Sequence, residues 1–441
     1  MQLSQLTTII GGALVGNDAE ISSVSIDSRT MQPGCLFVAL RGSNFDGHEF
    51  VQAAAQRGAA AAIVESEVEC DLPQIVVTDA LRALSDYARW HRLQFDPAVI
   101  AVTGSCGKTT TRALLESVFS QAGLVLATEG NYNNEIGVPL MLLKLTAQHR
   151  YLIIEMGASH KGEIAHLADL VRPHIGIITN AAAAHIEGFG TVADVAAAKG
   201  ELFEALDASG TAVINADDDY YGYWLSSFQS KAISFGLSDT ADVRAKWKLG
   251  QKPGFTLCLP GEVDQTINLK LLGKHNVRNA LAAAAAAQSL GLSAHVIKKG
   301  LELTEPVPGR LVEKKGLHGA QVIDDTYNAN PFSVKAAIDM LSQRSGNKIL
   351  VLADMRELGT QTEDWHYDVG LHAMQQGIQY LYAYGASTRH SVRAFGERAL
   401  HFSDQAGLVA ALKKELSSET VVLVKGSNSM NMSQVVDSLV L

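Results

Sequence analysis

A short stretch of this chain has the residue types and spacing of a loop that binds phosphate groups. Residues 103–110 read Thr-Gly-Ser-Cys-Gly-Lys-Thr-Thr, between the apolar run 99–102 and an amphipathic stretch at 109–121. Glycines let backbone N–H groups turn toward an anion, a helix start adds partial positive charge, and Lys108 adds a full one. Thr109 is placed to ligate Mg²⁺. The pattern predicts an ATP–Mg²⁺ site that drives an enzymatic reaction.

This loop departs from the strict phosphate-binding pattern at one position. Val102 stands where the pattern has its first glycine. The alternative is a glycine turn followed by an exposed lysine, but the strand-like residues before the loop and the helical residues after it favour phosphate binding. We interpret Cys106 as a small filler residue, although a thiol at a helix start can be acidic.

Polar residues follow the next two predicted strands. Glu155 comes after the strand at 152–154, and His185 follows the strand at 175–179. Ligands of open α/β sheets bind beyond the carboxyl ends of the strands, so the loop, Glu155 and His185 should share one rim. A carboxylate there suits Mg²⁺.

Lys199 stands on an apolar stripe. The segment 191–206 has a helix start at Thr191, and Lys199 lies four residues after Val195 and three before Leu202. A lysine there either extends its amine to water at the stripe edge or has lost its charge for a functional purpose.

Composition narrows the function classes. The chain has 441 residues, 47% apolar and 19% charged, which predicts a folded protein of two to four domains. A net charge of −10 argues against a nucleic-acid partner. Four scattered cysteines without a CxxC pair fit a reducing cytosol, and we expect no signal peptide and no membrane span.

Three α/β sections can be drawn along the chain. The first has strand-like pieces at 21–26, 35–40 and 74–77, with helices at 49–57 and 80–94. The second alternates strands and helices from residue 99, which predicts a doubly wound parallel sheet, and becomes β-rich at 231–272 before a helix at 276–290. A proline-rich linker at 305–309 precedes a second α/β sheet with strands at 321–324, 348–353, 380–384 and 421–424.

Together these motifs resemble the Mur ligases, a family of ATP-dependent amide-forming enzymes of peptidoglycan precursor synthesis. The resemblance covers essentially the whole chain. It rests on the phosphate loop, Glu-Met-Gly-Ala at 155–158, Ala-Lys-Gly-Glu at 198–201 and Gly-Lys-His-Asn-Val-Arg-Asn at 273–279. Asn-Tyr-Asn-Asn at 131–134 and Asp-Asp-Thr-Tyr-Asn at 324–328 imply the substrates UDP-N-acetylmuramoyl-tripeptide, D-alanyl-D-alanine and ATP.

The resemblance implies three α/β domains in a cytoplasmic enzyme that we expect to be a monomer. These are an N-terminal UDP-sugar-binding domain (1–79), a central doubly wound parallel-sheet P-loop ATPase domain with a small β-rich part (80–305), and a C-terminal Rossmann-like dipeptide-binding domain (310–441).

It also implies individual roles. The catalytic residues would be Lys108, Glu155, His185 and Lys199, with two Mg²⁺ ions held by Thr109, Glu155, His185 and a carbamylated Lys199. The ATP contacts would be Gly104, Ser105, Cys106, Gly107, Lys108, Thr109, Thr110, His275, Asn276, Asn279, Arg310 and Asn330. The UDP-substrate contacts would be Ser28, Arg29, Asp46, Gly47, His48, Asn131 and Asn134, and the dipeptide contacts Asp354, Lys425 and Ser427.

Simpler interpretations stay open. Residues 27–29 would also suit a turn with a surface arginine, and 425–427 a plain strand end, whereas Asn133 and Asn328 suit turn caps. Other functions to test are a different amino-acid ligase or a folylpolyglutamate-type ligase, a nucleotide-dependent switch or motor, and a small-molecule kinase.

Overall fold

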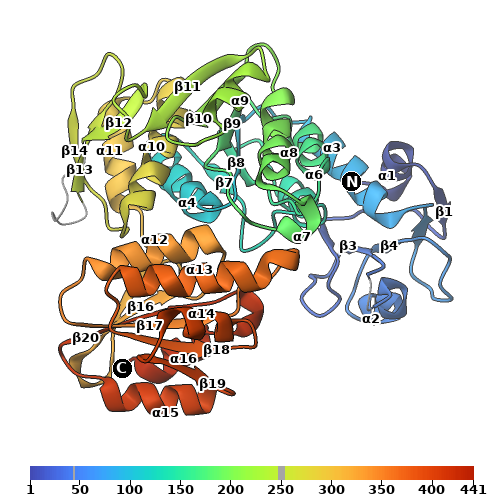
Figure 1. The fold of residues 1–441 in the computed structure, drawn as a ribbon. Helices are drawn as coiled ribbons and strands as arrows, with labels where there is room; N and C mark the ends of the chain where they lie inside the picture. The colour runs from blue at the N-terminus through green and yellow to red at the C-terminus, as the bar shows by residue number, and fades with distance from the viewer. Residues whose placement is uncertain (43–44, 247–253) are drawn as a thin grey trace. The chain divides into compact units, whose positions relative to one another are not determined.

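The computed structural model describes residues 1–42, 45–246 and 254–441, and its elements are labelled in Figure 1. Packing divides the chain into two compact units. One contains residues 1–101, 123–157 and 165–173, and the other contains 102–122, 158–164 and 174–441. No described helix combines the length and the apolar character needed to cross a membrane.

The N-terminal sheet is mostly parallel, with one antiparallel edge strand. Its order is β1 (Ala13–Val15), β5 (Gln74–Val76), β4 (Ala61–Val64), β3 (Cys35–Val38) and β2 (Ser23–Ser25), with β1 antiparallel to β5. The helices are α1 (Leu3–Ile10), α2 (Val51–Gln56) and α3 (Ala80–Arg92). Leu6, Ile63 and Leu84 are fully buried in one core, so α1 and α3 both pack on this sheet. Helix α1 and the strands β1 and β4 were not predicted.

The second sheet has nine strands. Their order is β14 (Gln265–Asn268), β13 (Gly254–Cys258), β12 (Val243–Lys246), β11 (Lys231–Gly236), β10 (Thr211–Asn215), β9 (Ile175–Ile178), β6 (Ala98–Thr103), β8 (Tyr151–Glu155) and β7 (Val125–Ala127). The pairs from β9 to β12 and the pair β7–β8 are parallel, whereas β12 to β14 are antiparallel. The predicted parallel sheet with a β-rich end is confirmed, except at 247–253, which lie outside the described residues.

Several helices accompany these strands. They are α4 (Lys108–Phe119), α5 (Gly137–Leu142), α6 (Glu163–Val171), α7 (Ile186–Phe189), α8 (Val192–Glu204), α9 (Tyr221–Ser226), α10 (Lys274–Ser289) and α11 (Ala294–Leu303). Helix α10 contacts α4 and the strands β10 and β11. Its residues 280–287 are seven alanines and one leucine, and none is exposed. Small side chains let neighbouring backbones approach α10 closely.

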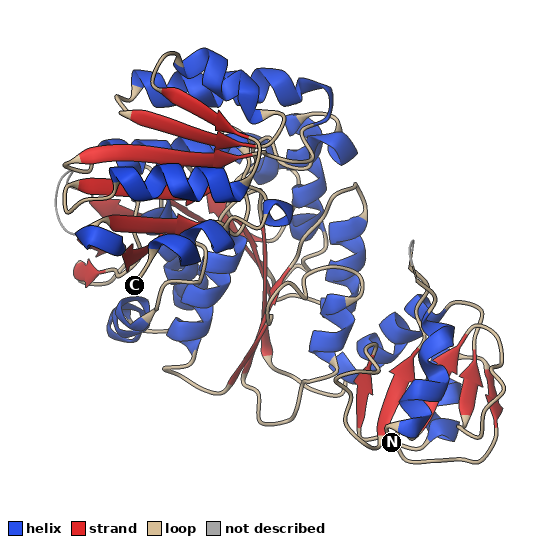
Figure 2. Cartoon of the chain, turned by 90° about the horizontal axis from the view of Figure 1, so that it is seen from below, coloured by secondary structure: helices blue, strands red, loops and turns tan. Residues whose placement is uncertain are grey.

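The C-terminal sheet carries helices on both faces (Figures 1 and 2). Its order is β15 (Val312–Lys315), β16 (Gln321–Asp325), β20 (Thr420–Lys425), β17 (Asn347–Ala353), β18 (Tyr380–Tyr384) and β19 (Ala399–Phe402). Two separate cores confirm the predicted layered α/β arrangement. One core receives α12 (Pro331–Ser342), α13 (Thr362–Gln375) and α14 (Thr388–Phe395), and the other receives α15 (Gln405–Glu415) and α16 (Ser433–Leu439).

The crossing of α11 over α4 positions the helix that follows the phosphate loop. A Cβ atom at Gly300 would collide with the backbone of Val118. We therefore expect Gly300→Val to lower the stability of this unit by about 1–3 kcal/mol, because the crowded helices cannot relax without repacking. Thermal denaturation followed by circular dichroism would measure this loss.

Gly222→Ala is the matched control, because a Cβ there meets no atom within 4 Å. This substitution should leave the midpoint temperature of thermal denaturation unchanged or raise it slightly. Equal transitions for Gly300→Val and wild type would show that the α4–α11 crossing is not tightly packed.

Candidate active site

The phosphate loop lies between the end of β6 and the start of α4, as predicted. Gly104 and Gly107 have φ values of 150° and 87°, which disfavour other residues. A Cβ at Gly104 would collide with Oγ1 of Thr179, and one at Gly107 would lie 2.5 Å from Oδ1 of Asn279. The loop needs glycine at both positions because side chains from other elements press against it.

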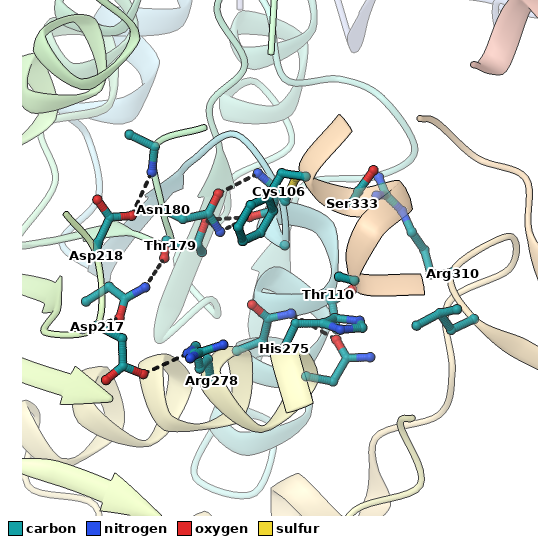
Figure 3. A pocket seen from close by; sticks show the side chains of 18 of the residues that line it. Cys106, Thr110, Thr179, Asn180, Asp217, Asp218, His275, Arg278, Arg310 and Ser333 are labelled. Atoms are coloured by element: carbon teal, nitrogen blue, oxygen red, sulfur yellow. Dashed lines mark hydrogen bonds and ion pairs between the residues drawn. The ribbon is translucent and has the colours of Figure 1, made fainter. Parts of the chain in front are cut away.

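Residues after β9 hold the loop from one side (Figure 3). The Cys106 carbonyl accepts hydrogen bonds from Thr179 Oγ1 at 2.6 Å and from Asn180 Nδ2 at 3.0 Å. The Cys106 N–H donates to Asn180 Oδ1 at 3.0 Å. Thr179 and Asn180 were not predicted, although the strand-end rule that selected His185 applies equally to Asn180.

Two cationic side chains lie on the loop. Lys108 Nζ donates to the Gly104 carbonyl at 2.6 Å, and Arg310 Nη2 donates to Thr109 Oγ1 at 3.2 Å. The Arg310 guanidinium also lies over the ring of Tyr327, 4.0 Å from its centroid. Arg310 Nε is buried without a hydrogen-bond partner among the described residues. Positive charge beside the N-terminus of α4 suits a polyphosphate.

Cys106 makes a side-chain contact that was not anticipated. Its sulfur accepts a hydrogen bond from Asn330 Nδ2 at 3.1 Å. Asn330 is also the N-cap of α12, where it accepts from the Ser333 N–H at 2.8 Å. Cys106 is therefore more than filler, because it joins the loop to the start of α12.

A pocket opens beside the loop (Figure 3). It is lined by the loop, the ends of β9 and β10, the first two turns of α10 and the start of α12, with Arg310, Asp325 and Lys425. Burial first, then the charges of Lys425 and Arg278, lowers the pKa of His275 to about 4, so its imidazole is neutral at physiological pH. A neutral ring beside amide groups suits an uncharged heterocyclic base.

The first two turns of α10 supply four of the pocket's polar side chains, His275, Asn276, Arg278 and Asn279. Asn279 Nδ2 donates to Asn276 Oδ1 at 2.9 Å, and Arg278 pairs with Asp217 at 2.7 Å. The structure thus brings the predicted His275, Asn276 and Asn279 together. Asp217 and Arg278 were not predicted, although Asp217 follows the end of strand β10.

Lys199 is the most buried cation near the loop. It lies on α8 with 2% of its surface exposed, and helix capping by Thr191 is confirmed. Burial, and to a lesser extent the charge of Lys108, lowers the pKa of Lys199 to about 7. Its amine faces the ring of Phe189 at 5.9 Å and pairs with no carboxylate in the described parts of the chain. The amine does not extend to water, so the stripe-edge interpretation is wrong.

His185 precedes α7 with a left-handed backbone, φ 54°. Burial and the charges of Lys108 and Lys199 lower its pKa, whereas the carboxylate of Glu357 opposes that shift. Lys108 and Lys199 thus act on His185 electrostatically, and Lys108 acts on Lys199.

Glu155 ends β8 and is 3% exposed. Its Oε1 accepts from Asn133 Nδ2 at 2.8 Å, whereas Oε2 is buried without a hydrogen-bond partner among the described residues. An unpaired buried carboxylate oxygen fits a cation. Asn133 is therefore no turn cap, and that interpretation is wrong. The cap is Asn134, whose Oδ1 accepts from the Gly137 N–H at 2.9 Å.

The predicted UDP-substrate residues of the first section mostly bond to one another. Asp27 binds the Arg29 guanidinium through two contacts of 2.9 Å, and the Arg29 side chain is 82% exposed. Asp46 accepts from the N–H of His48 and pairs with its Nδ1 at 2.6 Å. Ser28 is buried, Gly47 begins a short 3-10 helix, and Asn131 is exposed.

The predicted dipeptide residues also have partners within the protein. Asp354 Oδ1 accepts from the N–H groups of Ser387 and Thr388, each at 3.0 Å. Lys425 Nζ lies 2.5 Å from Asp325 Oδ2, and both side chains are buried. Ser427 Oγ accepts from the Arg356 N–H at 2.9 Å. Asn328 caps its own turn, as expected.

Known domain families match most of the chain. The Mur ligase family catalytic domain matches residues 20–95, the Mur ligase middle domain matches 102–287, and the Mur ligase glutamate ligase domain matches 309–428.

Curated relatives and solved structures match over nearly the full length. The UDP-N-acetylmuramoyl-tripeptide–D-alanyl-D-alanine ligase of Escherichia coli K12 is 42% identical over 99% of this chain and 98% of the relative. The Acinetobacter baumannii MurF structure has a TM-score of 0.92 at 33% identity, covering 98% of this chain and 97% of that one. The Thermotoga maritima MurF ligase in complex with ADP has a TM-score of 0.84 at 26% identity, covering 94% and 96%.

The low pKa of Lys199 makes stability depend on pH. Between pH 7 and the ordinary value of 10.5, the unfolded chain binds a proton that the folded site rejects, so stability rises with pH. In buffer free of CO₂, the free energy of unfolding of wild type should therefore rise relative to that of Lys199→Met. The difference should grow by up to about 1.4 kcal/mol per pH unit in this range. Urea unfolding can follow the fluorescence of Trp224, whose Nε1 donates to the Ala196 carbonyl of α8.

Lys161→Met changes an exposed amine and serves as the control. The free energy of unfolding of this control should change with pH as that of wild type does. If the unfolding free energies of Lys199→Met and wild type instead change equally with pH, the buried amine keeps an ordinary pKa.

Proposed function

The chain belongs to the Mur ligase family, and from this we propose that it joins D-alanyl-D-alanine to UDP-N-acetylmuramoyl-tripeptide, driven by ATP. The reaction is that of an acid–amino-acid ligase, and it yields ADP, phosphate and the UDP-muramoyl-pentapeptide. The observation that carries this conclusion is similarity along the whole chain to relatives named for this activity. The loop and pocket supply a matching nucleotide site.

The reaction requires two anions to meet. The terminal carboxylate of the tripeptide attacks the γ-phosphate of ATP, giving an acyl phosphate and ADP. The amine of D-alanyl-D-alanine then attacks the acyl carbon, and phosphate leaves. Lys108 and Arg310 lie where they offset the charge of the phosphates, and the N-terminus of α4 adds its dipole.

Nucleotide contacts extend from the loop into the pocket. Residues 104–110 bind the phosphates, and His275, Asn276 and Asn279 contact the adenine side. We assign Asn330 to the ribose side, and its contact with Cys106 of the loop supports this assignment. The similarity to the Thermotoga maritima MurF ligase, whose structure is a complex with ADP, also supports a nucleotide site.

The donor groups fit magnesium. Thr109 and Glu155 would hold one ion, and Glu155, His185 and Lys199 a second, with the unpaired Oε2 of Glu155 as supporting evidence. Bound Mg²⁺ stabilises the charge that develops on the transferring phosphoryl group.

Lys199 suits carbamylation. Its pKa of about 7 leaves a large neutral fraction, whose nitrogen lone pair attacks CO₂ to form an N–C bond as one proton is released. The product is an anion able to ligate metal, whereas an ammonium would repel it.

The remaining assignments follow the domain order. We assign residues 1–79 to UDP-sugar binding, 80–305 to ATP binding and catalysis, and 310–441 to the dipeptide. Ser28, Arg29, the 46–48 turn, Asn131 and Asn134 would contact the UDP substrate. Asn134 would do so through its amide nitrogen, because its oxygen accepts from the Gly137 N–H. Asp354, Lys425 and Ser427 would act on the dipeptide through the loops they hold. A monomer in the cytoplasm, where nucleotide-linked substrates occur, completes the proposal.

Phosphate release from ATP tests the reaction. Wild type should release phosphate only with UDP-N-acetylmuramoyl-tripeptide and D-alanyl-D-alanine together, and mass spectrometry should find the pentapeptide product. Lys108→Met should lower kcat by about 10²–10³-fold, because a preorganised charge is lost. Lys144→Met, an exposed lysine paired with Glu129, is the control. Release without either substrate would indicate a switch or motor, and a stable phosphorylated product without an amide would indicate a kinase.

Lys199→Ala tests the carbamate. Its activity should fall by at least about 10³-fold, and short carboxylates added to the buffer should restore part of it, since they replace the missing metal ligand. Full activity in the variant would contradict the role of Lys199.

A further inference from the structure

A carboxylate from the C-terminal part of the chain meets His185. Glu357 lies between β17 and the short 3-10 helix η3 (Gly359–Gln361), and its carboxylate pairs with Nδ1 of His185. The Glu187 N–H donates to the Glu357 carbonyl at 3.3 Å. Both His185 and Glu357 have left-handed backbones, with φ of 54° and 62°. Such conformations in non-glycine residues persist only where the surroundings enforce them.

The segment that carries Glu357 is held at the two preceding residues. The Met355 N–H donates to Nε2 of His366 at 3.0 Å, and the Arg356 N–H donates to Ser427 Oγ at 2.9 Å. His366 is fully buried, and its Nδ1 lies 2.7 Å from the Thr362 carbonyl. Burial lowers the pKa of His366, so its neutral ring can accept one hydrogen bond and donate the other.

Apolar packing flanks the same contact. Trp365 packs against a cluster that includes Ile186 and Phe189, and also against the core of the C-terminal sheet. The elements that carry His185 and Glu357 are therefore joined by buried surface as well as by charge.

We propose that Glu357 is a positioning residue for His185. It accepts the Nδ1 proton and so leaves the Nε2 lone pair for a divalent metal ion. This rests on the proposed function, in which His185 is a metal ligand. Metal-binding histidines commonly donate their second ring N–H to a carboxylate, which fixes tautomer and ring orientation. Apart from the ion pair with Glu357, the His185 ring makes no hydrogen bond to the residues that the structure describes.

The pair serves orientation more than stability. The Glu357 side chain is 58% exposed, and exposed ion pairs contribute little to folding. The carboxylate comes from the part matched by the glutamate ligase domain, whereas His185 comes from the part matched by the middle domain. The metal site is therefore complete only while these two segments are docked.

Two readouts test the role on the full-length protein. In ¹⁵N spectra of the histidine rings at about pH 8, His185 should be the Nδ1–H tautomer in wild type and shift toward Nε2–H in Glu357→Ala. The His185→Gln variant assigns the signals. Mn²⁺ titration followed by electron paramagnetic resonance, with ADP and bicarbonate present, should show affinity about 10–100-fold weaker in Glu357→Ala. Glu357→Gln should recover part of it, because its amide oxygen still accepts a hydrogen bond.

Glu363→Ala is the matched control, because it removes a carboxylate paired with His390 elsewhere in the C-terminal part. Its Mn²⁺ affinity should equal that of wild type. Unchanged His185 tautomer and Mn²⁺ affinity in a folded, active Glu357→Ala protein would overturn the proposal. Loss of Mn²⁺ affinity equal in Glu357→Ala and Glu363→Ala would also overturn it. Wild type that makes no pentapeptide, or binds no Mn²⁺, would instead contradict the proposed function.

Discussion

A phosphate loop must keep a fixed shape while its amide groups stay available to an anion. Here side chains from other elements impose that shape. Thr179 and Asn180 bond to the peptide groups of Cys106, and Asn279 lies against Gly107. The loop is thus tied to the ends of the neighbouring strand β9 and helix α10. Strand β9 and helix α10 also line the pocket, so the same contacts fix the pocket's position beside the loop.

Positive charge is concentrated at the loop. The charge of Lys108 acts on Lys199, and both lysines act on His185, while burial adds to the effect. This gathering of positive charge suits a polyanion with its metal ions. Burial that destabilises an ammonium at Lys199 also produces the neutral amine that carbamylation needs.

Local rules predicted much of the site, and long-range contacts account for the rest. The strand–loop–helix unit, the helix cap at Thr191 and the buried stripe around Lys199 depend on neighbours within a few residues, and the structure confirms them. Which asparagine of 131–134 reaches Glu155 depends on how the loop returns to β8. Asn330, which bonds to the Cys106 sulfur, and Glu357, which pairs with His185, lie more than a hundred residues away from their partners, and no periodicity encodes them. Helix α1 was missed because two buried leucines over eight residues make too short a pattern.

The alanine-rich stretch of α10 has a meaning for sequence variation. Eight consecutive residues without exposed surface offer no room for a larger side chain and no solvent-facing position to absorb a polar one. Glycine would add backbone freedom to the unfolded chain and weaken the helix. Few single substitutions should therefore be tolerated in this stretch, although alanine is among the simplest of side chains. A segment that reads as compositionally plain is thus among the least replaceable in the protein.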